Sequence, residues 1–61
     1  MEKIDSLNLG QKYLFVTDEN IEYRGIFIDK DKKYAYIKNV RHGGRFTSLF
    51  CMPISMIVRA S

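Results

Sequence analysis

A short charged run that ends in a tyrosine is the part of this 61-residue chain best suited to binding chemistry. The run DKDKKY ends in Lys30, Asp31, Lys32, Lys33 and Tyr34. Lysines contact phosphates and an aromatic ring stacks on bases, which is the combination that a single-stranded nucleic acid requires. An ordinary solvated turn is an equally good interpretation, because the aspartates partly neutralise the lysines.

A second basic cluster, formed by Arg41, His42 and Arg45, flanks the glycine pair at positions 43 and 44. These side chains could bind a phosphate, helped by the open backbone of the glycines. The tip of a hairpin is the simpler interpretation, because the acidic segment 18–22 offers the cluster partners within the chain.

The chain lacks any residue pattern typical of catalysis or metal binding. His42 is the only histidine and Cys51 the only cysteine, and the two do not lie within a few positions of each other. Asp29 and Asp31 could pair as carboxylates, but beside three lysines they are more typical of turn formers. We therefore predict a protein that is not an enzyme and needs no cofactor or metal.

Length and composition predict one small folded domain over residues 1–61. The chain is 46% hydrophobic and 28% charged, which excludes a low-complexity or disordered composition. A chain of this size buries only about 60% of the surface that its unfolded form exposes. Without disulfides or a metal, oligomerisation is the usual remaining source of stability.

The sequence also predicts a cytoplasmic protein with no membrane partner and no small-molecule substrate. It shows no leader and no apolar run near the roughly 20 residues that a membrane span needs. The net charge of +3 is concentrated in residues 24–45, which hold seven basic and two acidic residues. This distribution indicates one cationic surface.

Hydrophobic spacing predicts an all-β domain, a small five-stranded and strongly bent antiparallel barrel that stays partly open. Gly25 interrupts a strand and indicates the corner at which the sheet bends. A single helical turn could precede the sheet within residues 1–9. The expected strands are Lys12–Thr17, Ile21–Asp29, Tyr34–Val40, Arg45–Met52 and Met56–Ala60.

The last two expected strands carry apolar side chains on both faces, and a lone barrel of this size can bury only one. Apolar edge strands pair readily with another chain. Repeated head to tail, such pairing closes into a ring. The expected subunit-interface residues are Phe46, Leu49, Phe50, Met52, Met56 and Val58.

Residues Leu9–Ile28 resemble the first motif of the Sm, LSm and Hfq group of small RNA-binding barrels. They combine a Leu-Gly entry, an alternating strand, an acidic turn and a run of aromatic residue, basic residue and glycine. Asp31 follows that glycine by six residues, as the loop aspartate of the family does. Ile54–Val58 resembles the end of the Hfq form of the second motif. The resemblance implies an Sm-like barrel in a homo-oligomeric ring, with the loop after Asp29 facing RNA at the pore.

The chain departs from that pattern at two places. It has Ala35 where the family has an asparagine that contacts a base. It has Cys51-Met52 or Met52-Pro53 where Hfq has Lys-His and Sm proteins have Arg-Gly. We therefore expect RNA binding with relaxed sequence preference, through Lys30, Asp31, Lys32, Lys33 and Tyr34. The alternative is a structural or protein-interaction module that pairs its apolar edge strands with a partner protein.

Overall fold

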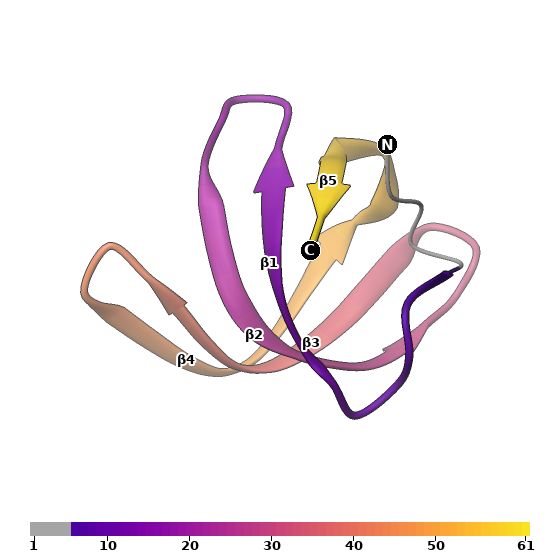
Figure 1. The fold of residues 1–61 in the computed structure, drawn as a ribbon, viewed down its shortest axis with the longest axis horizontal. Helices are drawn as coiled ribbons and strands as arrows, with labels where there is room; N and C mark the ends of the chain where they lie inside the picture. The colour runs from indigo at the N-terminus through magenta and orange to yellow at the C-terminus, as the bar shows by residue number, and fades with distance from the viewer. Residues whose placement is uncertain (1–5) are drawn as a thin grey trace.

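Short runs of β-branched and aromatic residues form five antiparallel strands in a single sheet (Figure 1). The computed structural model describes residues 6–61. A 3₁₀ turn, η2 (Ile54–Met56), connects the last two strands. The all-β prediction is confirmed. The strands are β1 (Lys12–Thr17), β2 (Glu22–Lys30), β3 (Tyr34–His42), β4 (Arg45–Pro53) and β5 (Ile57–Ala60).

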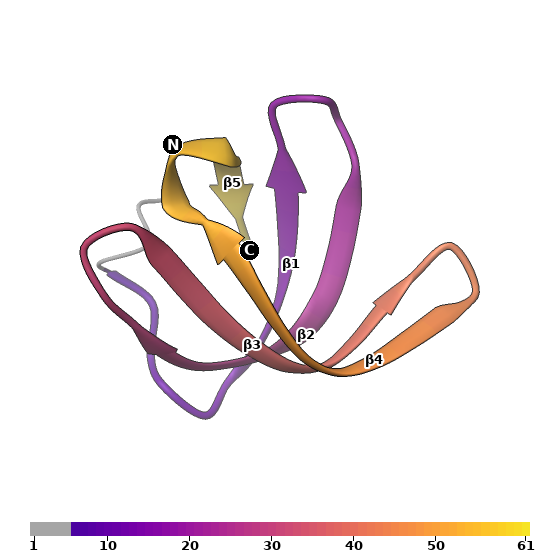
Figure 2. The same ribbon diagram turned by 180° about the vertical axis from the view of Figure 1, so that it is seen from behind.

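The strand order β4-β3-β2-β1-β5 leaves β4 and β5 at the two edges of the sheet. Strands β1 to β4 form a meander, and β5 returns to pair with the far side of β1. The sheet is strongly curved, so the end of β4 and η2 come back toward β1 and β5 (Figures 1 and 2). Within residues 6–61 no ladder joins β4 to β5, so the sheet is bent but not closed.

The expected strands match the observed ones to within two residues at each end, and β1 matches at both ends. Met56 was expected in the last strand, but it belongs to the 3₁₀ turn η2. Pro53 ends β4 as expected, since proline cannot donate to a ladder. The helical turn expected in residues 1–9 lies largely outside the described residues.

A β-bulge in β3, opposite Gly25 of β2, produces the bend. Arg24 pairs with Arg41 and Ile26 with Lys38, so the single residue Gly25 faces two residues of β3. One of them, Asn39, has a φ of 55°, a left-handed conformation that asparagine tolerates better than most residues. The extra residue bends β3 and brings its backbone against β2.

The core fills the concave side of this bend. Phe15 and Phe27 pack with their ring centroids 6.3 Å apart. Tyr13 and Tyr23 lie half-buried at the margin of the core, as their strand positions predict. The fully buried apolar cluster consists of Phe15, Phe27, Ala35, Ile37, Val40, Met52 and Ala60.

We predict that Gly25→Ala destabilises the fold by about 1–3 kcal/mol, the usual cost of overpacking. A Cβ atom at this position would lie 2.6 Å from Cγ2 of Ile37 and 3.0 Å from the carbonyl oxygen of Lys38. The backbone oxygen cannot move aside without breaking the ladder. Urea unfolding at one fixed protein concentration measures the effect, with the exposed Ser55→Ala as control. Equal stability of the two variants would contradict the prediction.

Candidate nucleic-acid interface

The loop between β2 and β3 has a defined shape because Asp31 holds it. Its Oδ1 atom accepts hydrogen bonds from the backbone N–H groups of Lys33 at 2.8 Å and Tyr34 at 2.7 Å. Its Oδ2 atom accepts a hydrogen bond from the hydroxyl of Tyr36 at 2.7 Å. The carboxylate thus forms an Asx turn, which agrees with the expectation that this residue forms a turn.

These hydrogen bonds change the acidity of both side chains. The Tyr36 hydroxyl and the two backbone N–H groups stabilise the carboxylate, so the pKa of Asp31 lies below its ordinary value. The same bond to Asp31 raises the pKa of Tyr36 to about 12. Asp31 is therefore charged across the neutral range, in the form that accepts all three hydrogen bonds.

The loop presents Lys32, Lys33 and Tyr34 to solvent, and Tyr34 is 39% exposed. Lys30 lies just before it, at the end of β2. The structure thus places all five expected RNA-binding residues in one loop and its flanks. Both carboxylate oxygens of Asp31 accept hydrogen bonds from the loop and from Tyr36. A contact between Asp31 and RNA stays a prediction.

The same loop lies against the connection between β4 and β5, as the meander predicts. The N–H of Ile54 donates to the carbonyl of Lys33 at 2.7 Å, and Tyr34 pairs with Pro53. An open cavity of about 550 Å³ lies between the two segments. Its walls come from Lys32, Lys33, Tyr34, Pro53, Ile54 and Ser55. An aromatic ring and two lysines therefore border one hollow.

Ala35 has no part in this surface. Its side chain is fully buried and lies opposite Met52, inside the core. Ala35 therefore contributes only packing.

Most of the expected interface residues lie at the surface of the two edge strands. Phe46 and Leu49 of β4 are 57% and 61% exposed, and Val58 of β5 is 40% exposed. Phe50 and Met56 are half-buried. Met52 was expected in the same surface, but it is buried in the core, so that expectation is wrong for this residue. Its side chain faces the concave side of the bend. The run of apolar residues in β4 does not show which of its side chains face that side.

The second basic cluster lies at the opposite end of the sheet, around the hairpin between β3 and β4. Gly43 and Gly44 have φ values of 54° and 83°, as a tight two-residue hairpin turn requires. The ring of His42 lies 4.6 Å from that of Tyr23, and its Nδ1 donates to the backbone carbonyl of Glu22 at 3.1 Å.

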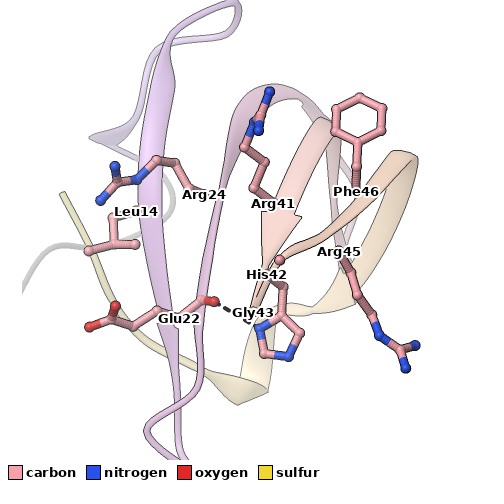
Figure 3. Close-up of a pocket in the computed structure, with 9 residues that line it drawn as sticks. Leu14, Glu22, Arg24, Arg41, His42, Gly43, Arg45 and Phe46 are labelled. Carbon is pink, nitrogen blue, oxygen red and sulfur yellow. Dashed lines mark hydrogen bonds between the residues drawn. The ribbon is translucent and has the colours of Figure 1, made fainter.

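An open cavity of about 350 Å³ adjoins this hairpin (Figure 3). Its walls include Glu22, from the acidic segment expected to lie near the cluster, and Arg24 of β2, which sequence reasoning had not joined to it. Regular pairing of β2 with β3, continued from Ile26 and Lys38, would place Arg24 opposite Val40 instead of Arg41. The bulge opposite Gly25 shifts the register, and nothing in the strand pattern gives the size of that shift.

Comparison of the chain with models of known protein families, with curated proteins and with solved structures gives no match. Among residues 6–61, no group of three or more His, Cys, Asp and Glu side chains is placed to hold a metal ion. Over the same residues, no helix has the length and apolar character needed to cross a bilayer.

We predict that Asp31→Asn returns the pKa of Tyr36 from about 12 toward that of an ordinary tyrosine. The bond stabilises the fold only while Asp31 is charged and Tyr36 is protonated. Its contribution is therefore present between the ordinary pKa values of the two groups. It is lost as pH falls through the lowered pKa of Asp31, and as pH rises through the raised pKa of Tyr36.

Ultraviolet difference titration of the tyrosines measures this change, and Tyr13→Phe serves as control because it leaves the Asp31 contact in place. If Asp31→Asn left the last tyrosine titration step of the wild-type protein unchanged, the hydrogen bond would not be its cause.

Proposed function

We propose that this protein is an Sm-like RNA-binding protein that forms a homo-oligomeric ring and contacts single-stranded RNA through the loop between β2 and β3. The proposal joins the motif resemblance to two structural features. These are the apolar edge strands and the basic loop beside their connection.

The edge strands support assembly of several copies. Strand β4 has nine residues and β5 has four, and each presents apolar side chains on a free edge. The two edges differ, so pairing β5 of one copy with β4 of the next is a head-to-tail contact, which repeats around an axis until it closes. Closure would cover Leu49 and Val58 and remove both free edges.

The hydrogen bond between Ile54 and Lys33 is the observation that carries the proposal. It ties the basic loop to the short connection between the two edge strands. Each junction between copies therefore has a basic loop beside it, and the ring repeats this loop once per subunit. Several weak contacts on one RNA strand then add up to useful affinity.

The chemistry of the loop supports binding with little sequence preference. Lys32 and Lys33 supply charge for phosphates, and the exposed ring of Tyr34 supplies a stacking surface that any base can use. Ala35 is buried, so it contributes no hydrogen bond that would select one base.

Two observations favour the alternative, a module that binds a partner protein. The loop already holds Asp31 beside its lysines, and the edge of β4 is long and apolar enough to accept a strand from a different protein. In that case the protein alone would be monomeric, and it would bind RNA weakly and without dependence on the loop.

We predict that the wild-type protein has several times the mass of the 7.2 kDa chain in size-exclusion chromatography with light scattering. Leu49→Glu with Val58→Glu should give monomers, because two buried charges in the interface would lack partners. Gln11→Glu, an exposed change on neither edge strand, is the control. A wild-type monomer at micromolar concentration would contradict the ring.

We predict that Lys32→Gln with Lys33→Gln weakens binding of labelled oligouridine and oligoadenosine alike. The slope of log affinity against log salt should become less steep by about 1.4, since each phosphate contact with a single strand contributes roughly 0.7. Fluorescence anisotropy at several salt concentrations measures both quantities, with Lys12→Gln, a lysine outside the loop, as control. Equal affinity and equal slope in the double variant would exclude the loop as the RNA contact.

A further inference from the structure

A row of four directly opposed residues crosses the sheet near the hairpin between β3 and β4. Leu14 pairs with Arg24, Arg24 with Arg41, and Arg41 with Phe46. Directly opposite residues of antiparallel strands point to the same face of the sheet. The row therefore places Arg24 and Arg41 side by side on one face. Arg45 precedes Phe46 in β4 and pairs with His42, so it points to the opposite face of the same hairpin.

The pairing of Arg24 with Arg41 is unfavourable in the protein alone. Like charges directly opposite each other destabilise a sheet. Arg24 and Arg45 form no ion pair with any carboxylate of residues 6–61. Arg41 has a different partner, the ring of Phe46, whose centroid lies 5.7 Å from its guanidinium carbon. The fold thus holds a pair of like charges together and orients one of them.

The cavity beside this row has a net positive charge. Its walls carry three arginines against one carboxylate, that of Glu22, so the sum is +2 with His42 neutral. Figure 3 shows that Arg24 and Arg41 leave neighbouring strands and diverge at their tips, whereas Arg45 points away from both. Diverging guanidinium groups cannot all hold one small anion, but they can contact separate phosphates along an extended chain.

We propose that Arg24 and Arg41 form a second RNA contact, which binds successive phosphates of a single strand at the end of the sheet opposite the lysine loop. This inference rests on the RNA binding proposed above and adds a second surface to it. The two contacts lie at opposite ends of β2, because Arg24 is near its start and the lysine loop follows its end.

Arginine suits this contact better than lysine would. Its planar guanidinium offers parallel donors that match two phosphate oxygens. The cation-π contact with Phe46 limits the orientations of the Arg41 guanidinium before RNA arrives, which reduces the entropy lost on binding. Gly43 and Gly44 add no side chains, so the backbone at the hairpin tip leaves room for a strand to approach.

Anisotropy titration of labelled oligouridine tests this site with Arg24→Gln, Arg41→Gln and the double variant. The double variant should bind about tenfold more weakly, with a salt slope less steep by about 1.4. Its thermal unfolding midpoint should equal or exceed that of the wild-type protein, because the substitutions remove the opposed charges. Arg59→Gln, an exposed arginine of β5 outside the cavity, is the matched control for Arg24→Gln.

The outcomes separate this inference from the proposed function. If Lys32→Gln with Lys33→Gln weakens binding but the double arginine variant does not, the second contact is overturned and the proposed function stands. If the wild-type protein binds no RNA, both fail. If inorganic phosphate or polyglutamate displaces the RNA at matched charge concentration, the site recognises negative charge alone and the assignment to an RNA strand is overturned.

Discussion

The close approach of β3 to Gly25 is the constraint on which the rest of this structure depends. The absence of a side chain there lets Ile37 and Val40 reach the backbone of β2. Opposite Gly25, β3 has one extra residue, which forms the bulge at Asn39. The sheet bends at this point, and the concave side becomes the core. Without the bend, five strands from so short a chain would expose one whole apolar face.

The bend also decides where the functional surfaces lie. The β3–β4 ladder places the end of β4 beside the loop between β2 and β3, where the N–H of Ile54 bonds to the carbonyl of Lys33, and the bend brings this end of β4 toward β1 and β5 (Figure 1). It leaves the other hairpin projecting from the opposite end of the sheet (Figure 1). One strand, β2, thus separates two basic surfaces of different chemistry, one with lysines and a tyrosine and one with arginines. An RNA strand that contacted both would cross the sheet.

Much of this arrangement could be predicted from the chain because its signals are local. Alternating apolar residues and turn residues set the strands, and the glycine within a strand indicates the corner. The basic loop and its proximity to Pro53 follow from an antiparallel meander. Two features were not predictable in this way. The burial of Met52 depends on which face of β4 turns inward, and the place of Arg24 depends on the register across the bulge.

The sequence by itself determined the fold class, the strands, the position of the bend and the charged character of the loop, because each depends on residues close together in the chain. Only the tertiary structure decided that Asp31 accepts a hydrogen bond from Tyr36, that Met52 is buried, and that Arg24 faces Arg41. These depend on pairing between distant segments. A bulge of one residue shifts that pairing, and no local pattern in the chain specifies the shift.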